Sequence, residues 1–533
     1  MTKEVGTAAA QEATGDRRLA LLLAMAMFVF VIDTSLMNVS ISAVVKDLDT
    51  TVSGVQSAVA IEALVSAAFI LIGSKIGDLF GRKRAYVLGL LLYVSGAIAM
   101  VFAQSLTPII VFWAVIGGLG ASLYLPAMQS LIHGNFEGTA QAKAYALVGA
   151  SAAIAAAIGP LLGGFLTTYL SWRVGFILEA AIIAVVLLGS RRLLVDVPYT
   201  GDRGVDTVGS VLSVLGMGGL VLGILAWQEG GESVGVLLAA GLAAMGALVY
   251  WLLRRKREGK PALLDPHLFE SKLFSFGISQ GILQQIALGG MLIALPIYLQ
   301  MVLDYNAMQA GLTLAPLSLT MFAVALVAGK RAGKRRPASL ILVGFALLLV
   351  AMLLLIPIVP RADTGWYLVA PLVLAGAGLG LLVSQLNNYT LSPISEERVG
   401  EAAGVNSATG SFGLSLGLAF AGAIMLAALS IAFTQKSEAS NVLAPPEQQR
   451  VADALEDDAQ VMSNAQLEEL LADQPEDVRE EIVSINTDAR PLALQVALLV
   501  PLLAALIGLL SSFRMIRLPD PAPTAAAEGA ALG

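Results

Sequence analysis

Long apolar stretches recur along the whole chain, and they constrain its fold more than any other feature. Fourteen such stretches are separated by charged or turn-rich breaks in a sequence of 533 residues. A helix of roughly 20 apolar residues spans the hydrocarbon core of a bilayer. Charged residues make up only 13% of the chain, too few to cover a soluble protein of this length. We therefore predict an all-α polytopic membrane protein.

The expected spans end where charges or turn residues begin. Their approximate limits are 19–41, 53–73, 86–104, 108–132, 145–168, 174–190, 207–227, 235–253, 274–302, 309–329, 338–359, 366–386, 402–434 and 491–513. With both termini in the cytoplasm, 25 of the 32 Lys and Arg residues fall in cytoplasmic segments and 7 fall outside. This asymmetry follows the positive-inside rule. We therefore expect a multi-pass protein of the cell membrane with both termini cytoplasmic.

Residue content excludes several classes of function. The chain has no cysteine and two histidines, so thiol chemistry and an HExxH zinc site are excluded. No GxxxxGK[ST] phosphate-binding loop occurs. No nucleophile–base or metal-ligand pattern is visible. We expect no cofactor, no metal, no nucleic-acid partner and no enzymatic activity.

Three carboxylates lie within the predicted spans, where ionisable residues are rare and mark function by default. They are Asp33 in "FVIDTSLMNVS", Glu62 in "AVAIEALVSAAF" and Glu179 in "GFILEAAIIAVV". At about 1.5 Å per residue, Asp33 and Glu62 lie at similar depth on consecutive helices. We expect them to face one aqueous cavity and to exchange protons, with Asn38 available to hydrogen-bond Asp33. Glu179, on a peripheral span, is the weaker candidate, and a structural role is the alternative for each acid.

Several stretches resemble signatures of one transporter family. "SKIGDLFGRKRA" contains Gly77, Asp78, Gly81, Arg82 and Lys83 and resembles the GxLxDxxGRK motif of the major facilitator superfamily, with Ser74 where a glycine is usual. "DTSLMNVSIS", "SWRVGF" and "LPIYLQMVLDYNAMQAGLTLAP" resemble segments of its fourteen-helix drug:proton antiporters. "GPLLGG" is similar to the antiporter motif of span five. Its matching residues are Gly159, Pro160, Gly163 and Gly164.

The resemblance implies the major facilitator fold, with two six-helix bundles, two inserted helices and a central cavity that opens alternately to either side. It divides the chain into a cytoplasmic tail at 1–18, an N-terminal bundle at 19–193, a linker with two extra helices at 194–272, a C-terminal bundle at 273–513 and a cytoplasmic tail at 514–533. The motif at Gly77–Lys83 is then a conformational gate.

Two features depart from a standard antiporter. In the fourth span, Ala114 and Gly117 occupy positions where the family motif has arginine and glutamine, which puts the usual proton coupling in doubt. The predicted outside loop at 435–490 contains 14 acidic and 4 basic residues. It is either a solvated, partly helical loop or a lid over the outer mouth.

Uncharged polar residues in the second half are candidates for lining the cavity. They are Gln280, Gln284, Gln385, Asn388 and Asn406. Helix–helix hydrogen bonds are the alternative for each of them.

The leading hypothesis is a monomeric secondary transporter that exports amphipathic or cationic small molecules in exchange for protons. A lipid or lipid-like substrate exporter of the same fold is the alternative. A receptor or scaffold acting through the acidic loop is a more distant one.

Overall fold

The computed structural model describes most of the chain as helices. The described residues are 17–519 without 137, 194–205, 229–232, 261, 331–334, 395–397, 441, 444–447, 449–450, 452–466, 468–470 and 473. Among them, fourteen helices are long and apolar enough to cross a membrane. The predicted number of spans is therefore confirmed.

The helices follow one another with short connections. Their bounds in the first half are α2 Arg17–Leu48, α3 Val52–Phe80, α4 Arg82–Phe102, α5 Leu106–Pro108, η1 Ile109–Gly117, α6 Gly118–Asn135, α7 Gly138–Tyr169, α8 Trp172–Leu193, α9 Thr207–Gln228 and α10 Val234–Arg257. Those in the second half are η2 Pro266–Glu270, α11 Lys272–Met301, α12 Ala307–Lys330, α13 Pro337–Ile358, η3 Val359–Arg361, η4 Gly365–Leu368, α14 Val369–Leu391, α15 Val399–Ala439, α18 Glu476–Ala497 and α19 Leu499–Met515.

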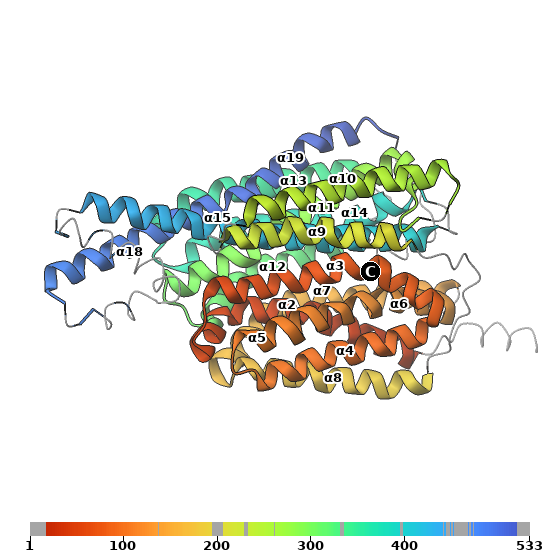
Figure 1. Cartoon of the computed structure of the whole chain (residues 1–533), viewed down its shortest axis with the longest axis horizontal. Helices are drawn as coiled ribbons and strands as arrows, with labels where there is room; N and C mark the ends of the chain where they lie inside the picture. Colours follow the sequence, from red (N-terminus) through yellow and green to blue (C-terminus); the bar gives the residue numbers. More distant parts are fainter. Residues whose placement is uncertain are drawn as a thin grey trace, which may run out of the picture.

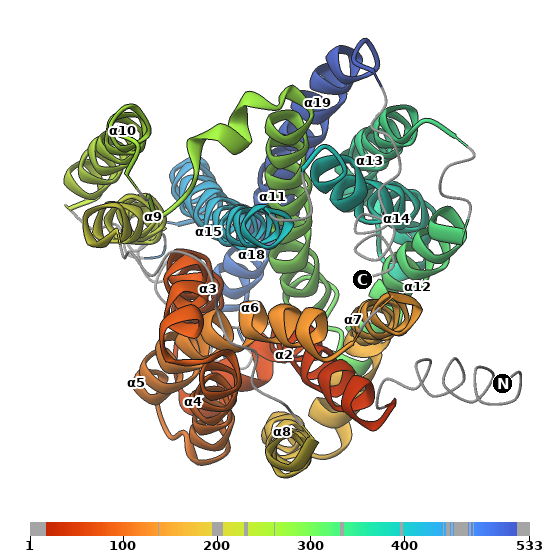
Figure 2. The ribbon, with the colours of Figure 1, turned by 90° about the vertical axis from the view of Figure 1, so that its right-hand side faces the viewer.

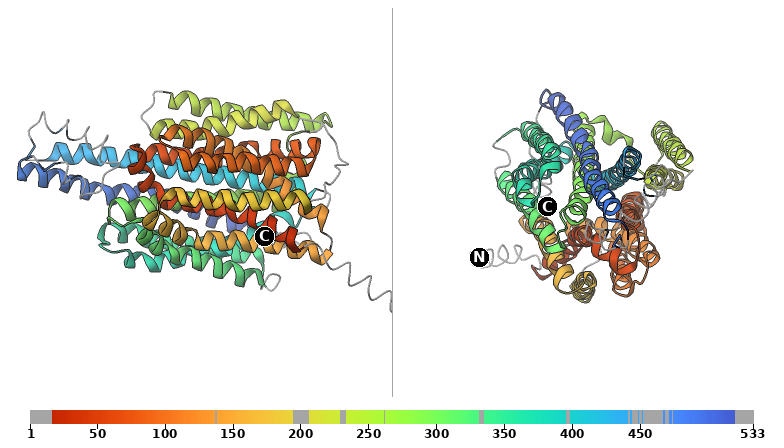
Figure 3. Two further views of the ribbon diagram at one scale, coloured as in Figure 1. Left: turned by 90° about the horizontal axis from the view of Figure 1, so that it is seen from below. Right: turned by 90° about the vertical axis from the view of Figure 1, so that its left-hand side faces the viewer.

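Helices α2–α8 form one group and α11–α19 form another (Figure 2). The inserted helix α9 contacts α3 of the first group and α15 of the second, while α10 packs on the outer side of α9 (Figures 2 and 3). Met217, Val221 and Ile224 of α9 are buried in the same apolar core as residues of α3 and α15. The inserted pair therefore covers the α3–α15 contact between the two groups.

The acidic segment that we expected to be an outside loop is partly built from long helices. Helix α15 has 41 residues, which corresponds to roughly 60 Å and exceeds the bilayer core. Figure 1 shows α15 and α18 projecting together beyond the other helices, and we name this end of the molecule the hairpin end. Residues 435–439 continue α15, and 476–490 belong to α18. Pro475 stands directly before α18, whereas most of 440–474 lies outside the described residues.

A polar contact joins the segment after α10 to the start of α15. Asp265 accepts hydrogen bonds from the guanidinium of Arg398 and from His267, and its backbone N–H donates to Glu401 over 2.8 Å. Partial burial raises the pKa of Asp265, but the hydrogen bonds of His267 and the charge of Arg398 outweigh it, so that its pKa is lowered overall. Asp265 therefore remains ionised at neutral pH and anchors this connection to the second group.

Glycine permits unusually close contact between the two groups at α7 and α12. A Cβ placed on Gly311 of α12 would lie 2.2 Å from the carbonyl oxygen of Pro160 in α7. A Cβ on Gly164 would lie 2.5 Å from the carbonyl oxygen of Ala307. Small residues at such contacts let helix backbones approach each other within a membrane. Thr168 reinforces the contact, because its hydroxyl accepts a hydrogen bond from the backbone N–H of Met308 over 2.9 Å.

We predict that Gly311→Ala destabilises the protein because its new methyl group meets backbone atoms that cannot give way. Overpacking of this kind costs about 1–3 kcal/mol, so the thermal unfolding midpoint in detergent should fall. Gly218→Ala in α9 is the matched control, because a Cβ there has no neighbour within 4 Å. Equal midpoints for the two variants would contradict the close α7–α12 contact.

Candidate functional site

Asp33 is the centre of the candidate site. It lies in the middle of α2 and its side chain is 2% exposed. The Tyr93 hydroxyl of α4 donates to its Oδ2 over 2.5 Å. The indole N–H of Trp113, in η1, lies 3.1 Å from both carboxylate oxygens. Two neutral donors from two other helices therefore hold this carboxylate inside the first group of helices.

The sequence did not lead us to Tyr93 or Trp113, and it led us to the wrong partner for Asp33. The amide of Asn38 donates instead to the backbone carbonyl of Thr34, one turn earlier, over 2.9 Å. Its Oδ1 is buried and accepts no hydrogen bond from the described residues. Tryptophan prefers membrane interfaces, and the position of Trp113 inside the predicted span 108–132 was the available indication for it.

Glu62 and Glu179 lie near Asp33. Glu62 of α3 is 5% exposed and Glu179 of α8 is 2% exposed. Both lie close enough to Asp33 to interact with it electrostatically. We expected Glu179 to be the weaker candidate because its span is peripheral, yet its side chain is buried within the first group of helices. Neither of its carboxyl oxygens has a hydrogen-bond partner among the described residues.

The three acids form a buried acidic cluster, which we define as Asp33, Glu62 and Glu179. Lys and Arg residues of the described chain form their ion pairs near helix ends, as Arg173 does with Asp47. No described ion pair neutralises the acidic cluster. Burial of an unpaired carboxylate is costly, and taking up a proton removes most of that cost. The arrangement can therefore bind and release protons, or attract a cation.

The predicted cavity amides lie in different environments. Gln280 is fully buried between α11 and α19, where its Nε2 donates to the Gly508 carbonyl over 3.0 Å and approaches Ser512 Oγ at 3.1 Å. Gln280 therefore forms a helix–helix contact, which was the alternative to lining the cavity. Asn406 of α15 donates to Asn387 Oδ1 of α14 over 2.8 Å and forms a second such contact.

Two of the other amides in the second group form hydrogen bonds with residues close to them in the sequence. Gln385 donates to the neighbouring Ser384 hydroxyl over 3.2 Å, and Asn388 accepts from the Ser392 hydroxyl over 2.8 Å. Gln284 is 7% exposed and sits one turn after Gln280 on α11. Its role, like those of Gln385 and Asn388, stays a prediction.

One of the two glycine motifs forms a tight turn between helices, and the other allows two helices to pack closely. Gly81 has φ +99°, a value that side chains disfavour, and it forms the turn between α3 and α4. Its N–H donates to the Gly77 carbonyl over 3.0 Å, and Arg82 and Lys83 begin α4. The side chain of Asp78 lies outside the described residues. In the other motif, Gly159 and Gly163 bring α7 against Ser35 and Leu36 of α2.

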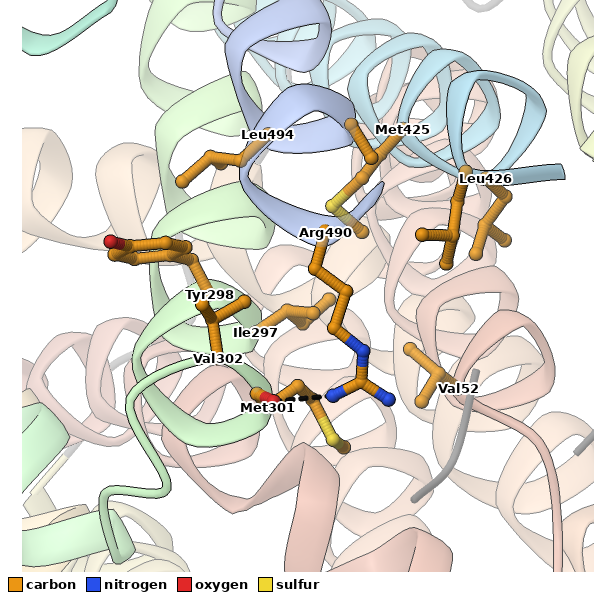
Figure 4. Close-up of a pocket in the computed structure, with 11 residues that line it drawn as sticks. Val52, Ile297, Tyr298, Met301, Val302, Met425, Leu426, Arg490 and Leu494 are labelled. Atoms are coloured by element: carbon orange, nitrogen blue, oxygen red, sulfur yellow. Dashed lines mark hydrogen bonds between the residues drawn. The ribbon is translucent and has the colours of Figure 1, made fainter. Parts of the chain in front are cut away.

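A small apolar pocket lies at the hairpin end between α3, α11, α15 and α18 (Figure 4). Met301, Met425 and Leu494 form part of its wall. Arg490 of α18 crosses the pocket and donates to the carbonyl of Met301, the last residue of α11. A cation at a helix C-terminus satisfies a carbonyl that has no partner within the helix. Arg490 thereby fastens α18 to the end of α11.

Comparison with known proteins identifies the family. The pattern of the Major Facilitator Superfamily matches residues 23–418. The chain belongs to the Major Facilitator Superfamily. Its fold is also similar to that of solved transporters. A bacterial homologue of the human lysosomal transporter Spinster, solved inward-facing and unoccupied, superposes with a TM-score of 0.61 at 14% identity, covering 95% of this chain and 98% of that one.

Relatives of this superfamily member are named as transporters and resistance proteins. The probable actinorhodin transporter of Streptomyces coelicolor is 28% identical over 407 residues, covering 75% of this chain and 70% of the relative. The multidrug resistance protein Stp of Mycobacterium tuberculosis is 28% identical, covering 76% and 75%. The methylenomycin A resistance protein of Bacillus subtilis is 26% identical, covering 78% and 89%. These relatives support a multi-pass efflux transporter, and not an enzyme, as the sequence predicted.

We predict opposite effects of leucine at two buried positions. Glu179→Leu removes two buried oxygens that have no described partner, and should raise the thermal unfolding midpoint by an amount equivalent to about 1–3 kcal/mol. Gln280→Leu removes hydrogen bonds between α11 and α19 and should lower the midpoint. Thermal unfolding of both variants in detergent measures the contrast. A lower midpoint for Glu179→Leu would show that this carboxyl has partners that stabilise the fold.

Proposed function

We propose that this transporter exports amphipathic small molecules, cations among them, in exchange for protons and by alternating access. The observation that supports the proposal most strongly is the acidic cluster. Three carboxylates lie in the interior of the first group of helices, and no described ion pair neutralises them. Such a cluster gains a proton or a cation more readily than it gains an anion.

The arrangement of the helices is consistent with alternating access. The two groups meet along α3–α15 and α7–α12. Glycines allow close packing at the α7–α12 contact, where the Met308 N–H also donates to the Thr168 hydroxyl. At the α3–α15 contact, the Ser415 hydroxyl donates to the Ala60 carbonyl over 2.8 Å. Interfaces of this kind can separate at one end while they remain packed at the other. Glu62 lies on α3, so that a movement of this contact would change the surroundings of the acidic cluster.

Names of the relatives support the class of substrate. Actinorhodin, puromycin and methylenomycin A appear in the names of three of them, and others are named multidrug resistance or multidrug transporter proteins. We assign the same broad class of organic small molecules to this chain. A lipid-like substrate is the second candidate, favoured by the lack of a basic side chain at Ala114.

We predict that Asp33→Asn and Glu62→Gln each reduce substrate-induced proton release at least about tenfold in proteoliposomes with an imposed pH gradient. Each variant replaces a carboxyl by an amide of similar size that cannot release a proton. Asp477→Asn, on the exposed first turn of α18, is the matched control and should behave as the unsubstituted protein.

Labelled lipids and lipophilic cations are tested side by side in the same vesicles. Proton release on addition of a lipophilic cation supports the proposal. Lipid movement that does not depend on the pH gradient would support the second candidate. Full proton release by both carboxyl variants would refute the role of the acidic cluster.

A further inference from the structure

The segment that contains Trp113 has an unusual backbone. Ile109–Gly117 forms a π-helix of 9 residues between α5 and α6. π-turns are rare, and they often mark functional sites because the extra residue in the turn re-aims the side chains around it. In this segment Phe112 is 43% exposed, whereas Trp113 is 3% exposed and turned into the bundle. The π-helix therefore presents the indole N–H to Asp33.

Neighbouring residues fix Trp113 and Tyr93 in these positions. Gly96 of α4 lets the backbone of Trp113 approach, since a Cβ on this glycine would lie 3.2 Å from the Trp113 Cα. The Trp113 ring packs edge-to-face with Phe176 at a centroid distance of 6.4 Å. The Tyr93 ring packs edge-to-face with Tyr124 at 5.6 Å. Both donors are thus held at Asp33 by packing that does not itself depend on the charge of Asp33.

The surroundings of Asp33 contain acids and phenols. The ionisable groups that interact electrostatically with Tyr93 and the carboxylate are Glu62 on α3, Glu179 on α8 and Tyr124 on α6. The residue after Trp113 is Ala114, which is fully buried and carries no charge. The hydrogen bonds of Tyr93 and Trp113 are therefore the stabilising contacts that the structure shows for an ionised Asp33.

The two donors respond differently to a proton on Asp33. A tyrosine hydroxyl can donate to a carboxylate or accept from a carboxylic acid, whereas an indole N–H can only donate. A charged acceptor makes the stronger bond. Ionised Asp33 is therefore bound tightly by both residues, and protonation weakens the bond to Trp113 in particular.

We propose that Tyr93 and Trp113 are positioning residues that determine when Asp33 releases its proton. This inference rests on the proposed proton exchange at Asp33. Neutral donors stabilise the carboxylate without cancelling its charge, so the site can still return to the protonated state. A permanent cation in this place would favour the ionised state throughout the cycle.

The test measures substrate-induced proton release against pH in proteoliposomes of the full chain. Trp113→Phe and Tyr93→Phe each keep an aromatic ring and remove one donor. Losing a donor disfavours the ionised carboxylate, so the midpoint of the pH profile should move to higher pH by about one unit or more in each variant. The double variant should move it further.

Matched controls separate this effect from loss of packing. Tyr124→Phe removes a neighbouring buried hydroxyl that has no hydrogen-bond partner among the described residues, and Trp172→Phe removes an indole that donates to Asp47 instead. Both controls should retain the unsubstituted profile. Active Trp113→Phe and Tyr93→Phe variants with an unchanged profile would overturn the proposal.

A second measurement applies even if a variant loses transport. Thermal unfolding of Trp113→Phe, Asp33→Asn and the double variant forms a double-mutant cycle. We expect coupling between the two positions that is larger at alkaline pH, where Asp33 is ionised, than in acid, where it is protonated. Absence of coupling over the whole pH range would overturn the proposal. If the unsubstituted protein releases no protons, the proposed transport fails, while this cycle still reports whether Trp113 stabilises the ionised carboxylate.

Discussion

The hydrogen bonding of Asp33 is the contact on which the rest of the site depends. A carboxylate in the middle of a membrane span is costly, and this one is compensated by Tyr93 from α4 and Trp113 from η1. These bonds require α2, α4 and the fourth span to lie within a few ångströms of each other. The glycine at position 96 permits that approach, and the π-helix points the indole inward.

The overall fold could be predicted from the sequence because the number and length of the apolar stretches determine the membrane-spanning helices. The sequence has fourteen apolar stretches, and among the described residues fourteen helices are long and apolar enough to cross a membrane. The sequence motifs also indicated the family that the comparison confirmed. The hairpin end was predicted less well. Residues 435–439 and 476–490 are polar, and polarity alone does not distinguish a loop from a helix that continues beyond the bilayer.

The contacts of the site could be predicted only in part. The depths of Asp33 and Glu62 follow from the helical rise, but the direction of each side chain depends on helix rotation and on irregularities such as η1. The sequence therefore indicated three acids that the structure brings together, and it missed Tyr93 and Trp113. We expected Glu179 to be the weaker candidate because the family places its span at the edge. A peripheral helix still turns one face inward, and Glu179 lies on that face.

The central claim is that Asp33 gives up a proton when substrate binds. Infrared difference spectroscopy of the purified protein, with and without a lipophilic cation, measures this directly through the carbonyl stretch of a protonated carboxyl group. The account predicts that substrate removes such a band in the unsubstituted protein and that the band is missing in Asp33→Asn. An identical difference spectrum in the two proteins would contradict it.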